Sequence, residues 1–557
     1  MKKGIVSGII LLFIVVIVIQ PIGITIIDRH VSQVNKTPCK GFTSRGDILY
    51  VGGSGSRNYT RIQDAIDNAS DGDTVFVYDY LSPYEENIVI DKTINLIGEN
   101  RETTVIDGNN IGDTVYISTD SVNITGFTIR SSGSSWNDAG IDIYSECNTI
   151  TFNNISSNYG IGIGVESFNN IVSSNIISNN YLAGICLYGS CNIITGNNIT
   201  SNEISGIELS MSNGNTIIEN TIKFNNYDGI ELSNSNDNNV SGNTIISNNW
   251  NAITLSNSNN NKVSGNNLLN NFRGIHVIEG SKNNAIADNA ISLNTDDGIY
   301  FWGSSNNIIT YNNISNNREG IYLRASSLIT ITSNIILNNE DGIGVSGGSS
   351  NTLMDNKISS NNEYGITLWH SSTNIITNNT ISSNNHHGLH IVGPSNILSG
   401  NIITLNNGHG IYIRSWSNNI ISNNTITSNN EDGLYIEDSS DDTIKSNIIT
   451  GNYNGINIRY SDNINIISND IELNNNYGII LTIPRQITIQ KNNFFDNRKN
   501  AFFVGFRHKW KGNYWNQARI LPKLIFGYGT ININSTIYLP FPWIKIDWHP
   551  ALRPYDI

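Results

Sequence analysis

The sequence has few of the residues that mark most other architectures. Its four cysteines, Cys39, Cys147, Cys186 and Cys191, form no CxxC pair, which argues against a zinc ribbon or a thioredoxin-like site. The three methionines and the missing cysteine cluster leave few soft ligands for Cu(I). Basic runs are also missing and the formal net charge is −14, so no nucleic-acid partner is expected. Helical periodicity over ten or more residues is not visible, which disfavours a helical repeat.

The chain has instead a short internal repeat. A Gly, or in one case an Ala, precedes an aliphatic residue at intervals of 22, 23 or 24 residues, and a degenerate anchor at Ala501 ends the series. After each of these anchors the pattern is aliphatic, variable, aliphatic, which is typical of a strand with one buried face, and two more short strands follow. The anchors are Gly140, Gly162, Gly184, Gly206, Gly229, Ala252, Gly274, Gly298, Gly320, Gly342, Gly365, Gly388, Gly410, Gly433, Gly455, Gly478 and Ala501.

Asparagine recurs between these strands. An Asn pair such as Asn316-Asn317 precedes most anchors, a second column lies about fourteen residues after the anchor (Asn312, Asn334), and a looser one lies eight or nine after it (Asn351). Asn tolerates the left-handed conformation that a sharp corner needs, and copies stacked about 4.8 Å apart can pass side-chain hydrogen bonds along the stack. Three strands and three corners per repeat predict an all-β, right-handed, three-sheet parallel β-helix.

The two ends of the chain differ from the repeats. Residues 1–27 combine Lys2-Lys3 with apolar runs, which fits both a cleaved signal peptide and an uncleaved membrane anchor over residues 4–27. Either form predicts that the rest is exported to the cell surface or the extracellular space. The expected segments are 28–47 as a tether, 48–120 as the N-terminal cap and first coils, 121–490 as repeats, and 491–557 as a Trp- and Pro-rich C-terminal cap.

A short capping helix is expected near the start of the first coil. Thr60-Arg61-Ile62-Gln63 has the form of a capping box, and Ile62, Ala65, Ile66 and Ala69 then share one helical face. Strands are predicted at 74–78, 88–90 and 94–97. Such a helix would cover the open end of the stack, which would otherwise template aggregation.

Several motifs resemble a known family. Gly72-Asp73-Thr74, Leu96-Ile97-Gly98-Glu99 and Val105-Ile106-Asp107-Gly108 resemble the opening of pectin-lyase-like β-helix proteins, and the coils resemble NosD-like or CASH-domain repeats. Gly512-Asn513-Tyr514-Trp515-Asn516 and Asp547-Trp548-His549-Pro550 resemble the closing segment of archaeal NosD-like proteins. The resemblance spans residues 48–557 and implies the fold. It implies no single function, because the superfamily holds lyases, hydrolases, epimerases, adhesins and copper-site maturation proteins.

Function must then come from outward-pointing residues, which stand two and four places after each anchor. From Gly274 onward they combine aromatic rings with Arg and carboxylates, as a groove for a sugar chain requires. Exposed sheets favour Tyr, Trp and Thr in any case, so a surface without a ligand has the same composition. The predicted substrate-binding residues are Tyr300, Trp302, Tyr322, Arg324, Trp369, Tyr435, Glu437 and Arg459.

Carboxylates gather just before three successive anchors. Asp297, Glu319 and Asp341 are expected to lie one coil apart, where they need a cation, a raised pKa or full solvation. A Ca²⁺ site and a general acid/base pair are two solutions, and a row of solvated turn residues is the third.

Five of the nine histidines lie between residues 370 and 409. The predicted catalytic set is His387, His390, His409, Tyr412, Arg414 and Asp432. Arg would neutralise a uronate carboxyl while His or Tyr moves protons, which is a lyase or epimerase step. With His386 the same histidines can instead hold Zn²⁺ or Cu²⁺, and exposed histidines without a special role are the simplest alternative.

The sequence therefore predicts an exported cell-surface β-helix that binds a polysaccharide or surface glycan, with the membrane as a partner through the N-terminal segment. The pattern fits both a binding protein and an enzyme, which would be a polysaccharide lyase, epimerase or glycoside hydrolase. The rival is a non-catalytic structural or adhesion rod, and NosD-like periplasmic copper or metal handling is a third option.

Overall fold

The computed structural model describes residues 46–532 and 538–557. The predicted signal or anchor at 1–27 and nearly all of the predicted tether lie outside the described residues. Within them, no helix is long and apolar enough to cross a membrane.

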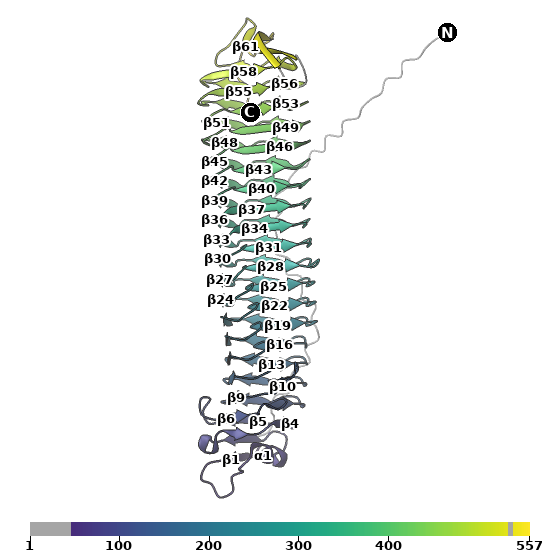
Figure 1. The fold of residues 1–557 in the computed structure, drawn as a ribbon, viewed down its shortest axis with the longest axis vertical. Coiled ribbons are helices and arrows are strands. Elements are labelled where there is room, and N and C mark those ends of the chain that lie inside the picture. Colours follow the sequence, from purple (N-terminus) through teal and green to yellow (C-terminus); the bar gives the residue numbers. More distant parts are fainter. Residues whose placement is uncertain (1–45, 533–537) are drawn as a thin grey trace, which may run out of the picture. The chain divides into compact units, whose positions relative to one another are not determined.

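The described residues form stacked coils, and a typical coil gives one strand to each of three parallel sheets, A, B and C (Figure 1). In a typical coil, β31 (Ile299–Trp302) lies in sheet C, β32 (Ile308–Thr310) in sheet A and β33 (Asn313–Ser315) in sheet B. Each strand pairs in parallel with its copy one coil on. The fold is therefore the three-sheet parallel β-helix that the repeat predicts.

Sheets A and B span nearly the whole stack. Sheet A has 21 strands, from β1 (Ile48–Val51) to β59 (His508–Lys511), and sheet B runs from β3 (Tyr84–Glu85) to β60 (Tyr514–Trp515). The predicted early strands are observed as β2 (Thr74–Val77), β4 (Ile88–Ile90) and β5 (Asn95–Gly98).

Sheet C carries every predicted binding residue. After β4 its strands are β7 (Val115–Ile117), β10 (Ala139–Ile143), β13 (Ile161–Val165), β16 (Ile185–Leu187), β19 (Ile207–Ser210), β22 (Ile230–Ser233), β25 (Ile253–Ser256), β28 (Ile275–Ile278), β31, β34 (Glu319–Arg324), β37 (Asp341–Ser346), β40 (Ile366–Trp369), β43 (Leu389–Val392), β46 (Ile411–Ser417), β49 (Leu434–Ser440), β52 (Ile456–Arg459), β55 (Tyr477–Thr482), β58 (Lys499–Val504), β61 (Lys523–Asn532) and β62 (Tyr538–Asp547). The last two form an antiparallel hairpin whose first strand continues the sheet from β58.

The core is a column of aliphatic side chains. Ile299, Phe301, Ile309 and Ile314 of one coil are all 0% exposed. Burying one such side chain contributes about 1.5 to 3 kcal/mol before the entropy of ordering is subtracted. The anchor is small because a Cβ at Gly298 would lie 2.6 Å from both the next anchor's carbonyl oxygen and the Ile314 side chain.

The asparagine ladders are confirmed, with one correction. At a typical position, Asn312 Nδ2 donates to Asn334 Oδ1 (3.0 Å), and Asn312 Oδ1 accepts from the backbone N–H of Asn289 (3.0 Å). The left-handed residue, however, is the one before the ladder Asn: Tyr311, at a φ of 55°. The prediction that the same Asn makes the corner and the ladder was wrong, because the ladder side chain must point along the stack.

The N-terminal helix is confirmed as α1 (Ile62–Asn68), with Ile62 and Ile66 buried. Its predicted capping box was wrong, since the side chain at the N-cap position makes no capping hydrogen bond. The Glu86 carboxylate accepts instead from the backbone N–H groups of Ile62 (2.8 Å) and Gln63 (3.1 Å). A carboxylate from a neighbouring segment thus satisfies the first turn.

Asp547 ends the ladder of asparagines between sheets A and B. Its buried carboxylate accepts from the N–H groups of Gly512 and Asn513 (both 2.9 Å) and from Asn513 Nδ2 (3.1 Å). Trp510 and Trp515 pack in the core, whereas Trp543 and Trp548 are exposed. The last ladder donors therefore reach an acceptor supplied by the hairpin.

Candidate functional site

The outer face of sheet C between β28 and β52 brings the predicted substrate-binding residues, with His390, Tyr412 and Arg414, into two neighbouring columns, which we call the sheet C face. Residues paired across successive strands are His276, Tyr300, Tyr322, Gly344, Thr367, His390, Tyr412, Tyr435 and Asn457. The second column holds Trp302, Arg324, Ser346, Trp369, Val392, Arg414, Glu437 and Arg459. Rings and charges therefore recur at the spacing of one coil.

The rings of this face differ in accessibility. Trp302 is 54% exposed and Trp369 is 44% exposed, so both offer a free ring surface. Tyr300 is only 7% exposed, because the Arg273 guanidinium lies 4.3 Å from its ring centre. The two tryptophans are therefore the stronger candidates for stacking on a ligand, and Tyr300 supports the surface from below.

The predicted calcium residues do not form one ligand shell. Asp297 is fully buried between two guanidiniums, 3.0 Å from Arg318 and 3.6 Å from Arg273. Asp341 Oδ1 accepts from the backbone N–H of Tyr364 at 2.9 Å. These carboxylates already have partners inside the protein, which disfavours a Ca²⁺ site here.

Glu319 is the exception among these acids. Its carboxyl covers Gly344, where any Cβ would collide with Glu319 Oε2. Burial, followed by the nearby charges of Asp297 and Asp341, raises the pKa of Glu319 to about 8. At neutral pH this group is a protonated acid that can donate a hydrogen bond, the state needed for a general acid.

His387 and His409 stack on each other with ring centres 4.8 Å apart. His387 Nδ1 accepts from the backbone N–H of His409 (2.9 Å), and His409 Nδ1 accepts from that of Asp432 (3.1 Å). In the neutral rings the proton therefore sits on Nε2. Burial first, and neighbouring histidines next, lower the pKa of His387 to about 2 and of His409 to about 4.

This hydrogen bonding weighs against a metal at the same place. In the described part of the chain, His387, His409 and Glu431 are the group whose potential ligand atoms lie within 4.8 Å of one another. A metal on Nε2 would move the ring proton to Nδ1, where a backbone N–H already points. His386 lies at the edge of the group, its ring 4.1 Å from that of His387. The arrangement favours two neutral rings that accept backbone hydrogen bonds.

His390 differs from His387 and His409 in that its Nδ1 accepts no backbone N–H. Its Nδ1 is buried and has no hydrogen-bond partner among the described residues. Its ring centre lies 5.0 Å from that of Trp369 in the second column and 4.9 Å from that of Tyr412 in its own column. Burial, then His386 and Arg414, lower the pKa of His390 to about 4, so it is a neutral base at pH 7.

The remaining predicted catalytic residues line the same stretch. Tyr412 donates to Glu437 Oε2 at 3.5 Å, and Arg459 donates to the Tyr435 hydroxyl at 3.2 Å. Burial, with Glu437 next, raises the pKa of Tyr412, which therefore keeps its proton at neutral pH. Asp432 is occupied, since its two oxygens accept amides from the next coil.

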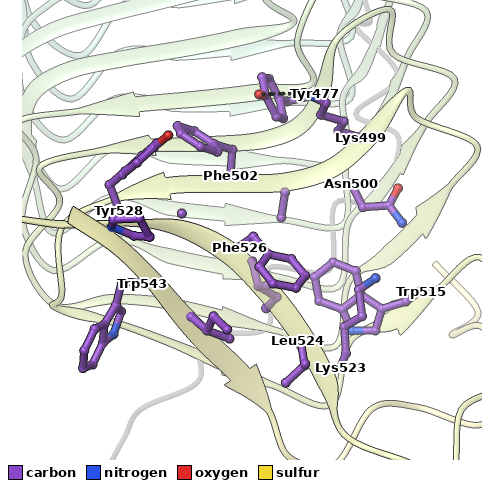
Figure 2. A pocket seen from close by; sticks show the side chains of 15 residues that line it. Tyr477, Lys499, Asn500, Phe502, Trp515, Lys523, Leu524, Phe526, Tyr528 and Trp543 are labelled. Carbon is purple, nitrogen blue, oxygen red and sulfur yellow. Dashed lines mark hydrogen bonds between the residues drawn. The ribbon is translucent and has the colours of Figure 1, made fainter. Parts of the chain in front are cut away.

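Sequence reasoning missed two features of the molecule. Arg318 neutralises Asp297, although no motif marks it. A cavity of about 720 Å³ also lies between the last coils and the C-terminal hairpin (Figure 2). An excess of Lys and Arg after residue 490 is the sequence signal that distinguishes this end of the chain, and it was not used.

Comparisons with solved structures show similarity at low identity. The Azotobacter vinelandii mannuronan C-5 epimerase AlgE6 A-module is 16% identical over 61% of this chain and 93% of its own, with a TM-score of 0.34. DFA-IIIase from Arthrobacter chlorophenolicus A6, without its lid and in complex with GF2, is 11% identical over 56% and 94%, with a TM-score of 0.39. The Dettilon tailspike protein gp208 is 13% identical over 59% and 66%, with a TM-score of 0.36.

The family comparison is decisive where the others are not. A comparison with curated proteins found no match. The model of the right-handed beta helix region matches residues 113–268, 239–380 and 373–509, which together cover most of the chain. The repeat, the three parallel sheets and this match agree, and the chain belongs to the right-handed beta helix family.

Proposed function

We propose that the sheet C face binds a polysaccharide chain that runs along the stack of coils, on an exported protein. The observation that carries the proposal is the register of Trp302, Trp369 and the arginines in one column. One coil step, about 4.8 Å, is close to the length of one sugar residue in an extended polymer. Successive sugars can therefore meet successive coils.

The chemistry of the two columns suits a sugar polymer. Exposed indole rings stack on pyranose faces, and guanidiniums pair with carboxylate or sulfate groups in a bidentate fashion. Arg324 and Arg414 are exposed, and Arg324 lies 5.9 Å from the Trp302 ring. An anionic or hydroxyl-rich ligand would find both kinds of contact side by side.

Turnover at this face would depend on His390. Its neutral imidazole is the base that would remove a proton next to a uronate carboxyl, while Arg414 neutralises that carboxyl and Tyr412 supplies a proton. The same face without turnover is a lectin-like surface. Product analysis separates these two versions of the proposal.

The test is binding of the purified full-length chain to a panel of acidic and neutral polysaccharides. We expect the double variant Trp302→Ala/Trp369→Ala to weaken binding about tenfold or more, since each substitution removes a stacking ring. The matched control is Trp136→Ala/Trp250→Ala, which also removes two exposed tryptophans, away from the face. Equal losses in both variants would contradict the proposed face.

Product masses are read in the same incubations. Products that disappear in His390→Asn would identify an enzyme and place its base. Binding without products would identify a binding protein. Polymer binding that survives unchanged in the Trp302/Trp369 variant would contradict this face as the binding site, and neither binding nor products in the wild type would leave the structural rod as the better description.

A further inference from the structure

The cavity at the C-terminal hairpin lies at the end of the same face. It is walled on one side by β55 and β58, through Tyr477, Lys499 and Phe502, and on the other by β61 and β62. Figure 2 shows Tyr477, Lys499 and Phe502 on the coil strands opposite Phe526 and Leu524 on the hairpin. Its volume of about 720 Å³ lies within the range of small-molecule sites.

Strand register makes the cavity continuous with the sheet C face. Asn457 on β52 pairs with Ile480 on β55, which pairs with Phe502 on β58. The second column continues from Arg459 through Thr482 and Val504 to Tyr528 on β61. A polymer lying on the face and extended past β52 would therefore arrive at the cavity, where the hairpin forms the far wall.

The charge of this end is opposite to that of the rest. Residues 491–557 carry ten Lys and Arg against three Asp and Glu, a formal net charge of +7 in a chain of −14, so the remainder carries −21. None of those ten cations has a carboxylate within 4.0 Å among the described residues. Positive charge without neutralising carboxylates attracts anionic ligands to this end of an otherwise acidic chain.

Two of these cations line the cavity. Lys499 Nζ lies 3.4 Å from the Tyr477 hydroxyl and 5.2 Å from its ring centre, and Lys523 Nζ lies 5.6 Å from the centre of the Trp515 ring. Both ammonium groups thus sit beside aromatic surfaces inside a partly enclosed space. Rings with flanking ammonium groups match a sugar that carries an acidic substituent.

We infer that this cavity is an end subsite that binds the terminal acidic sugar of the polysaccharide, with Lys499 and Lys523 contacting its carboxylate or sulfate group. The inference rests on the proposed function and deepens it, because it names an acidic polymer as the ligand class. The hairpin wall makes the cavity a place for a chain end, whereas the open face can hold internal residues.

The test uses the full-length chain and isothermal titration with short probes: digalacturonate, a sulfated disaccharide, and the neutral disaccharide of the same backbone. We expect the acidic probes to bind and the neutral one to bind at least about tenfold more weakly. Lys499→Gln/Lys523→Gln should remove that preference. The matched control, Lys509→Gln/Lys511→Gln, removes the same charge from β59, outside the cavity, and should change binding less than about twofold.

The outcomes separate this inference from the proposed function. Equal losses in the two lysine variants would mean general attraction to a basic end and would overturn the subsite. Polymer binding that depends on Trp302 and Trp369 but not on Lys499 and Lys523 would also overturn the subsite. The sheet C face would then remain supported as the binding surface. Acidic disaccharide binding that needs the two lysines, without polymer binding to the face, would support the subsite and overturn the face. Acidic probes that fail to bind the wild type would overturn the subsite.

Discussion

Two columns of side chains in this molecule accept backbone N–H groups from a neighbouring coil, but they are built from different residues. The ladder between sheets A and B is asparagine at every coil from Asn153 to Asn513, and each side chain accepts a backbone N–H from the coil before it. The column just before the anchors accepts from the coil after it, and its acceptors are mixed: Asp228, Asp341, His387, His409 and Asn454.

This difference helps to separate catalytic candidates in a repeat protein from residues that only accept a backbone hydrogen bond. In the mixed column Asp, Asn and His do equivalent work, so a histidine there is explained by a backbone N–H that needs an acceptor. His390 lies in the neighbouring column, and its Nδ1 accepts no backbone N–H. Catalysis is therefore expected at titratable groups that form no such structural hydrogen bond.

A substitution in the asparagine ladder between sheets A and B should have the largest effect on stability. Asn312→Ala removes bonds to Asn334, Ile286 and Thr310 and leaves the buried N–H of Asn289 without its acceptor. We expect a local loss of about 3 to 5 kcal/mol, because several buried polar groups become unsatisfied together. Hydrogen exchange of the flanking coils measures it, since a long repeat array does not unfold in two states. Exchange unchanged from that of the exposed control Tyr311→Asn would refute the ladder's role.

A substitution in the column just before the anchors should destabilise the protein less. His387→Leu removes one acceptor and should destabilise its coil by about 1 to 3 kcal/mol, whereas His387→Asn keeps an acceptor, as Asn454 does, and should cost far less. His387 and His409 have folded pKa values far below 6.5, so wild-type stability falls as pH drops from 6.5 toward 4. His387→Asn should flatten part of that slope in pH-dependent melting. Leu and Asn variants of equal stability would contradict the acceptor role.

Glu319 should have the smallest effect on stability, and its pH dependence is opposite to that of the histidines. Its folded pKa of about 8 lies above the ordinary 4.5, so the folded protein keeps a proton that the unfolded chain releases. Stability should therefore fall as pH rises from 4.5 to 8 and stay level above that. Glu319→Gln should be more stable than the wild type at pH 9, by on the order of 1 to 2 kcal/mol, and similar to it at pH 4. Melting curves that shift equally at both pH values would show that the carboxyl is ionised in the fold.

Much of the fold was predictable because the repeat samples the same physical demand many times. The anchors, the buried aliphatics and the asparagine columns appear at each coil, so a period read from the sequence predicts all three sheets. The caps were less predictable. Glu86 and Asp547 each occur once, and their partners lie in neighbouring coils or across the hairpin.

The positions of the candidate site residues were predictable from the sequence, but their burial and contacts were less so. The outward pattern placed Trp302, Trp369 and His390 on one face, as the register confirms. It could not tell that Tyr300 lies beneath Arg273, since Arg273 comes from a different turn of the chain.

The sequence by itself determined the period of the coil, the inward and outward faces of each strand, and the acidic stack with its basic end, because these follow from local alternation and composition. Only the tertiary structure decided which ring nitrogen of His387 meets a backbone N–H, which carboxylates meet arginines, and where the hairpin encloses a cavity. Those outcomes depend on contacts between neighbouring coils and on burial, which set protonation and partner together.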